Sequence, residues 1–156
     1  MSKKRTAFSL VELIIIVMWV GILAAIAVPR LNFAIISKQK AEALTGKIIT
    51  DLRLTRRLAI SDAANNTIGF ELKMVGSAPY AAYEIENCDT LETVASHTIY
   101  SGVNVKCPGG SESRFSFGPL GNLQAGSGTK LNVSAEGRSF KITVNPATGT
   151  VICVEN

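Results

Sequence analysis

Histidine, cysteine and aromatic side chains are scarce in this sequence, and their scarcity excludes several kinds of site. The 156 residues include one histidine, His97, and three cysteines, and aromatic residues make up 6%. The cysteines form no CxxC pair, and their separations do not fit the ligand spacing of a zinc site. No paired carboxylate or cysteine motif marks His97 as catalytic, so we expect a solvated or hydrogen-bonded surface residue at a strand edge. We therefore expect no catalytic residue, no metal, no cofactor and no enzymatic activity.

Basic side chains are in excess mainly because of the first seven residues. The whole chain carries a net charge of +4, from 16 basic and 12 acidic residues. Lys3, Lys4 and Arg5 lie in the first seven residues, which contain no acidic residue, so the remainder has 13 basic and 12 acidic residues, or +1. Binding to nucleic acid through phosphates generally needs several basic contacts. A nucleic-acid partner is therefore not expected from charge.

An apolar run over Leu10–Val28 contains a single charged residue, Glu12. Nineteen residues reach about 29 Å as a helix, close to the hydrocarbon thickness of a bilayer. The basic residues before the run favour a cytoplasmic N-terminus. We therefore expect a single-pass inner-membrane protein with its C-terminal domain in the periplasm. The alternative is a secretory signal peptide, for which Ala25 and Ala27 offer small residues but whose apolar core is usually shorter.

The three cysteines lie in the C-terminal two-thirds of the chain, as expected for an exported domain in an oxidising compartment. Three cysteines allow three single pairings. We favour Cys88–Cys107, which would brace the segment between them. Cys153, in the alternating run VICVE, is either a buried apolar residue or the true partner of one of the others.

A second helical pattern follows the apolar run. Pro29 is expected to kink the helix or weaken one turn. Beyond it, apolar residues recur every three or four positions, which predicts an amphipathic helix that ends near Asn65 and Asn66. The predicted stripe comprises Leu44, Ile48, Leu52, Thr55, Leu58 and Ala59. A nearly continuous helix from Ser9 to Ala64 would be about 84 Å long, and part of it would have to project from a domain of this size.

From Thr67 onward the pattern alternates every two residues, which predicts short strands. Seven runs are separated by Gly-, Pro- and Ser-rich turns: 67–75, 80–86, 97–107, 114–123, 130–136, 139–145 and 150–155. The close spacing of the last three predicts an antiparallel meander. One sheet face is expected to pack on the helical stripe. The predicted core contributors are Phe70, Tyr83, Phe115, Phe117, Phe140, Ile142 and Val144.

The order of these features resembles a type IV pilin-like precursor. A basic leader is followed by AFSLVEL, an apolar helix with a proline, an amphipathic helix and a β-domain. The resemblance implies that prepilin peptidase cuts between Ala7 and Phe8 and that the new N-terminus is methylated. Phe8 would then be first, Glu12 fifth and Pro29 twenty-second in the mature chain. Ala7 departs from the glycine usual in the family, which makes the efficiency of cleavage less certain.

The resemblance implies an α+β pilin-like fold, with a long N-terminal helix, half membrane and half amphipathic, packed on an antiparallel β-domain. The expected parts are a leader over 1–7, a transmembrane and assembly helix over 8–29, an amphipathic helix over 30–66 and a β-domain over 67–156. The implied partners are other pilin or pseudopilin subunits, prepilin peptidase/methyltransferase and the inner membrane. The chain would serve a type IV pilus or a type II secretion pseudopilus.

Glu12 is interpreted as an assembly residue. Cleavage before Phe8 would create an α-ammonium that Glu12 of a neighbouring subunit can meet inside a bundle of apolar helices. Either charge is costly alone in an apolar setting, and pairing offsets much of that cost. The alternative is a glutamate that is solvated or hydrogen-bonded within its own helix.

The C-terminal body is similar to the GspH/FimT group of minor pilins and pseudopilins. The similarity covers LRLTRRLAISDAANNTIGFEL, RFSFGPLGNL and ITVNPATGTVICVEN. Some FimT-like members bind DNA through basic residues after the glycine of the last hairpin. Here Gly149 is followed by Thr150 and Val151, and only Arg138 and Lys141 lie upstream. A DNA-binding minor pilin of a competence pilus is therefore the alternative function, and nucleic acid is an unlikely partner.

Overall fold

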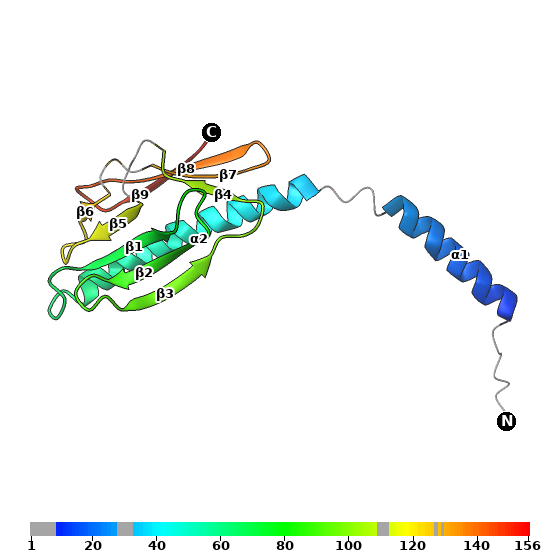
Figure 1. Ribbon diagram of the computed structural model, residues 1–156, viewed down its shortest axis with the longest axis horizontal. Coiled ribbons are helices and arrows are strands. Elements are labelled where there is room, and N and C mark those ends of the chain that lie inside the picture. The colour runs from blue at the N-terminus through cyan, green and yellow to red at the C-terminus, as the bar shows by residue number, and fades with distance from the viewer. Residues whose placement is uncertain (1–8, 28–32, 109–112, 127, 129) are drawn as a thin grey trace, which may run out of the picture. The chain divides into compact units, whose positions relative to one another are not determined.

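A computed structural model describes residues 9–27, 33–108, 113–126, 128 and 130–156. The chain divides into two compact units, Met1–Phe33 and Ala34–Asn156. The first contains helix α1, Leu10–Ala27, and the second contains nearly all of helix α2, Phe33–Ser61, together with the β-strands (Figure 1). The protein is therefore α+β with antiparallel sheets, as expected. The expected sites Ala7, Phe8 and Pro29, and the expected kink, lie outside the described residues.

The expected membrane half of the N-terminal helix is not found. α1 has 18 residues and is about 27 Å long, whereas a span needs roughly 20 residues and about 30 Å. Among the described residues no helix combines the length and the apolar character required to cross a membrane. This finding overturns the expectation of a single-pass inner-membrane location. The structure describes α1 and α2 separately and does not describe residues 28–32, so the expected continuous helix from Ser9 to Ala64 is not shown.

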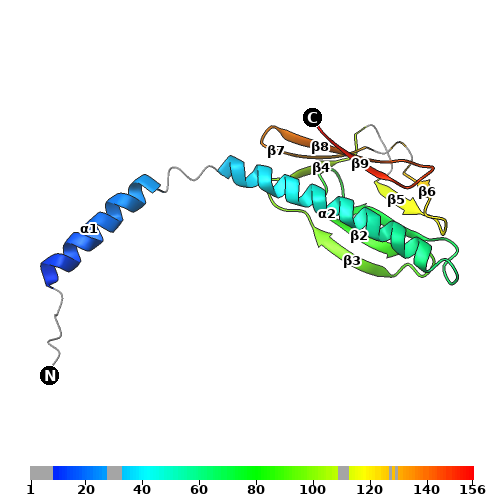
Figure 2. The ribbon, with the colours of Figure 1, turned by 180° about the vertical axis from the view of Figure 1, so that it is seen from behind.

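The second unit consists of α2 and two antiparallel sheets. The five-stranded sheet has the order β3-β2-β1-β5-β6, and the four-stranded sheet has the order β4-β7-β8-β9. Seen from behind, α2 lies in front of β2 (Figure 2). The strands are β1 Phe70–Val75, β2 Ala82–Asn87, β3 Thr93–Thr98, β4 Asn104–Lys106, β5 Arg114–Phe117, β6 Leu123–Ala125, β7 Leu131–Ala135, β8 Arg138–Val144 and β9 Val151–Glu155.

The core confirms the helical stripe. Leu44, Ile48, Leu52 and Ala59 of α2 are at most 1% exposed, and Thr55 is fully buried. Every residue predicted for the sheet side of the core is buried as well: Phe70, Tyr83, Phe115, Phe117, Phe140, Ile142 and Val144. Both sheets contribute to this single cluster, so the helix is covered by two sheets and not by one. Burial of this apolar surface is the main term that stabilises the unit.

The described residues form nine strands where the sequence predicted seven. The expected strand 97–107 is divided, because a turn at Ser101 and Gly102 separates the end of β3 from β4. The expected strand 114–123 covers β5 and the turn before β6. The predicted meander is confirmed, since β8 pairs antiparallel with both β7 and β9.

Candidate functional site

Glu12 lies in the first turn of α1. Ser9 immediately precedes the helix, and its carbonyl accepts hydrogen bonds from the amides of Glu12 (3.0 Å) and Leu13 (3.1 Å). The Glu12 residue is exposed, and among the described residues its carboxylate has no hydrogen-bond or ion-pair partner. A carboxylate in the first turn is stabilised by the helix dipole. The carboxylate oxygens of Glu12 can nevertheless accept hydrogen bonds from another chain.

The rest of α1 is apolar on all sides. Its large hydrophobic side chains are between 49% and 73% exposed, and Trp19, in the middle of the helix, is 61% exposed. A helix that is hydrophobic all round is normally buried among other apolar groups. An exposed apolar surface of this extent marks an interaction site. The exposed apolar surface of α1 is therefore of the kind that is usually buried by other apolar groups.

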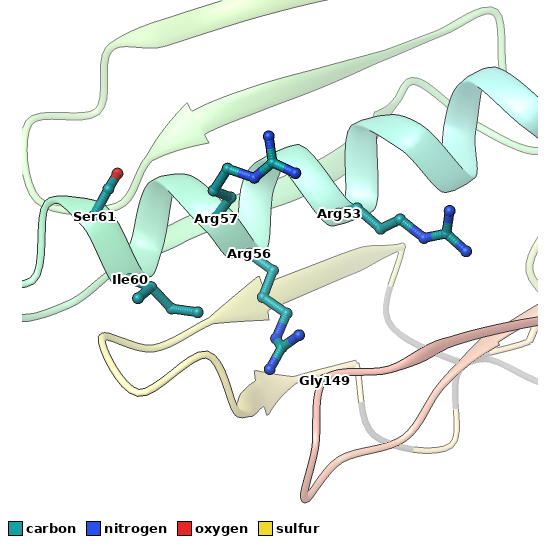
Figure 3. Close-up of a pocket in the computed structure, with 6 residues that line it drawn as sticks. All are labelled: Arg53, Arg56, Arg57, Ile60, Ser61 and Gly149. Atoms are coloured by element: carbon teal, nitrogen blue, oxygen red, sulfur yellow. The ribbon is translucent and has the colours of Figure 1, made fainter.

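A pocket of about 430 Å³ lies on the second unit, against the C-terminal half of α2. It is lined by three arginines and three further residues: Arg53, Arg56, Arg57, Ile60, Ser61 and Gly149. Figure 3 shows the Arg56 side chain running from the helix toward Gly149 of the β8–β9 turn. The Arg56 Nε donates a hydrogen bond of 2.9 Å to the carbonyl of Gly121. This bond fixes one guanidinium between α2 and the turn before β6.

A buried polar cluster joins α2 to the five-stranded sheet. The hydroxyl of Tyr83 donates a hydrogen bond of 2.7 Å to Asp51, and His97 Nε2 lies 3.5 Å from the same carboxylate oxygen. The rings of Tyr83 and His97 have centroids 5.3 Å apart. His97 lies on the edge strand β3, and its side chain is 27% exposed and paired with Asp51, which agrees with a partnered surface residue at a strand edge. The arrangement fixes the helix on the sheet and offers no nucleophile.

Tyr83 makes the stability of the second unit sensitive to alkaline pH. Burial, together with the hydrogen bond to Asp51, raises the pKa of Tyr83 well above its ordinary value of 10.0. Above pH 10 the unfolded chain loses a phenol proton that the folded chain retains. Stability is thus fully present below pH 10, and above it the free energy of unfolding should fall by about 1.4 kcal/mol per pH unit.

Chemical denaturation of wild type and Tyr83→Phe over this pH range measures the effect. Wild type should lose stability more steeply than Tyr83→Phe between pH 10 and the pH at which the folded phenol ionises. Burial also raises the pKa values of Tyr80 and the three cysteines, and both proteins share these contributions. Equal slopes for the two proteins would show that Tyr83 ionises normally when folded.

The expected disulfide between Cys88 and Cys107 is absent, and all three cysteines are free. Cys88 follows β2 of the five-stranded sheet and lies 3.9 Å from the hydroxyl of Ser116. Cys107 follows β4 of the other sheet and packs near Tyr80. The predicted pair is therefore not formed in this structure, in which Cys88 and Cys107 follow strands of different sheets. Cys153, on β9, is exposed and not a buried apolar residue.

The β8–β9 turn carries no basic side chain. Asn145 organises it, accepting hydrogen bonds through its side-chain oxygen from the amides of Ala147 and Thr148. Of the two upstream cations, Arg138 is engaged in ion pairs with Glu42 (2.7 Å) and Glu155 (2.6 Å). Within the described part of the chain, no group of three or more histidine, cysteine and acidic residues is placed to hold a metal ion.

The arginine pocket is the feature that sequence reasoning missed. The sequence places Arg53, Arg56 and Arg57 between the residues of the apolar stripe, and in the structure Arg53 and Arg57 are exposed and Arg56 is half-buried. Sequence reasoning did not indicate that Gly121 and Gly149, far away in the chain, would meet them. No family model, no curated protein and no solved structure matches this chain.

Proposed function

We propose that this chain is an assembly subunit of a filament of the type IV pilin kind, a minor pilin or pseudopilin of a pilus or a type II secretion pseudopilus. In this role α1 packs among the apolar helices of other subunits, and the second unit forms the body of the subunit. One observation carries the proposal. α1 is exposed and apolar on all sides, and Glu12 stands in its first turn without a described partner.

Packing of α1 among similar helices accounts for both parts of this observation. Burying one large aliphatic side chain contributes about 1.5 to 3 kcal/mol, and α1 exposes more than ten. Burying Glu12 alone would oppose assembly, because an unpaired carboxylate is costly in an apolar environment. An ammonium group on a neighbouring subunit removes that cost. The N-terminal amine produced by the proposed cut before Phe8 provides such a group four residues from Glu12.

The alternative function, a DNA-binding minor pilin, receives less support. The β8–β9 turn lacks basic side chains, and Arg138 is neutralised by two glutamates. Of the cations near this hairpin that the resemblance would require, the turn has none and Arg138 is engaged, which leaves Lys141. The filament role depends on none of them.

Recovery of the chain in sheared filaments tests the proposal. We expect a chain tagged after Asn156 to co-sediment with the filament fraction of its own cells and to decorate filaments under immunoelectron microscopy. The matched control is the tagged chain with Ile16→Asp, which places a second carboxylate on the exposed surface of α1 and should be excluded. Absence of the wild-type chain from filaments that assemble normally would contradict the proposal.

A further inference from the structure

Three neighbouring arginines on α2 have no counterion among the residues that the structure describes. Arg53 lies three and four positions before Arg56 and Arg57, so all three occupy about one turn of helix and repel one another. No acidic side chain of the described residues forms an ion pair with any of them. Elsewhere Arg138 has two glutamate partners and Lys73 pairs with Glu86. The arginine cluster therefore presents a concentrated positive charge that a negatively charged ligand would stabilise.

The pocket around these arginines is partly apolar. Ile60 lines it and is 46% exposed, although it is a large aliphatic residue. Leu120, the residue before Gly121, is 89% exposed. Gly149 allows the close approach of Arg56, since a Cβ atom there would lie 2.8 Å from Arg56 Nε. A ligand with carboxylates and an aliphatic side chain suits this surface better than a bare phosphate.

The same chain displays a segment with this chemistry in the loop between β2 and β3. Leu91 is 72% exposed and stands between two exposed acidic residues, Asp89 and Glu92. Leu91 also has a φ of 59°, a left-handed conformation that is uncommon for a bulky residue. Strained residues of this kind cluster at functional sites.

The loop is held in a defined shape. The side-chain oxygen of Asn87 accepts hydrogen bonds from the amides of Asp89 (2.9 Å) and Thr90 (3.3 Å). The carbonyl of Asn87 accepts a further bond from the amide of Leu91 (2.9 Å). A loop that is ordered before binding loses less conformational entropy when it docks.

We propose that the arginine pocket binds an acidic peptide segment, the β2–β3 loop of a second copy of this chain. Asp89 and Glu92 pair with the arginines, and Leu91 lies against Ile60. The contact joins two different surfaces, so each subunit retains a free loop and a free pocket, and repetition produces an open array unless the rotation closes a ring. The inference rests on the proposed function in that a filament subunit must meet further copies or close relatives of itself.

Site-specific photocrosslinking in the full-length chain tests this contact. One copy carries a benzoylphenylalanine in place of Leu91, and the acceptor copy is labelled with ¹⁵N, so that mass spectrometry identifies crosslinks between copies. We expect the crosslink to fall within residues 53–61 or at Leu120 of the acceptor. The double substitution Arg53→Glu/Arg57→Glu in the acceptor should reduce it about tenfold, as should Asp89→Lys/Glu92→Lys in the probe copy.

Combining the two charge reversals should restore most of the crosslink, which loss of folding cannot do. The matched control is Lys38→Glu/Lys40→Glu, two exposed lysines of the same helix, which should leave the crosslink unchanged. Crosslinks to other segments, or no response to charge reversal, would overturn the contact. So would an arginine-dependent gel shift with a single-stranded oligonucleotide in the absence of the crosslink, since this would assign the pocket to nucleic acid.

The outcome is distinguishable from failure of the proposed function. Filaments that contain the chain but yield no loop-to-pocket crosslink would refute the contact alone. A charge-dependent crosslink between copies that never enter filaments would refute the filament role alone.

Discussion

Glu12→Gln is expected to lower incorporation of the chain into filaments more than a hundredfold, with the second unit folded as in wild type. The substitution keeps the size of the side chain and removes its charge. In the assembled state the neighbouring ammonium would then be buried without a partner. Removing one member of a buried ion pair costs about 3 to 5 kcal/mol, which corresponds to a loss of two to nearly four orders of magnitude in affinity. Quantitative immunoblotting of sheared filaments measures the amount of the Glu12→Gln chain incorporated relative to wild type.

Leu13→Gln is the matched control, because it places the same amide on the next residue of α1 and leaves the charge of Glu12 intact. It should reduce incorporation much less than Glu12→Gln. Circular dichroism of both variants should show an unchanged second unit, since α1 belongs to the other compact unit. If Glu12→Gln enters filaments at the wild-type level, Glu12 has no pairing role in assembly.

Gly69→Ala should lower the free energy of unfolding by about 3 kcal/mol or more. Gly69 has a φ of 104°, and an added Cβ would collide with the backbone carbonyl of Phe117 on β5. Asn66 holds this position through hydrogen bonds to the amide (2.7 Å) and the carbonyl (2.8 Å) of Gly69. Relief of the collision would displace β1 from either the α2–β1 connection or β5. Asn66 holds Gly69 on the first side, and the backbone of Phe117 lies against it on the second.

Gly76→Ala shows how much of the loss of stability comes from backbone conformation alone, without a steric collision. Gly76 also has a positive φ, 90°, but no atom lies within 4 Å of the position that its Cβ would occupy. Gly76→Ala should therefore lower the free energy of unfolding only through conformational strain, by about 1 to 2 kcal/mol. Urea denaturation of both variants gives the comparison. Equal losses of stability would mean that the Gly69–Phe117 approach is not tight in solution.

The amphipathic pattern predicted α2 and its buried face because helical periodicity records burial directly. Leu44, Ile48 and Leu52 needed no tertiary information beyond the existence of a core. The same reasoning missed β3, whose residues are exposed or half-buried, so that no alternation of apolar and polar residues marks it. It also extended one strand from β5 through the turn at 118–122 to Leu123, and so did not predict β6 as a separate strand.

The remaining errors concern relations that spacing along the chain does not encode. The predicted pair Cys88–Cys107 was chosen from position in the sequence, which does not show that the two residues follow strands of different sheets or that both thiols are free in this structure. His97 looked isolated because its partner Asp51 lies on α2, 46 positions earlier. The arginine pocket requires three segments to meet. The apolar N-terminal run predicted a helix where the structure has α1, but no described helix meets the requirements for crossing a membrane, which the membrane-spanning interpretation needed.

The central claim is that α1 assembles in a filament through Glu12 and an amine created by cleavage before Phe8. Intact-mass and N-terminal peptide measurements on chain recovered from sheared filaments test it most directly. The account predicts a mature chain that begins at Phe8, lacks residues 1–7 and carries a methyl group on its N-terminal nitrogen. A filament-bound chain that begins at Met1, or at any residue other than Phe8, would contradict it.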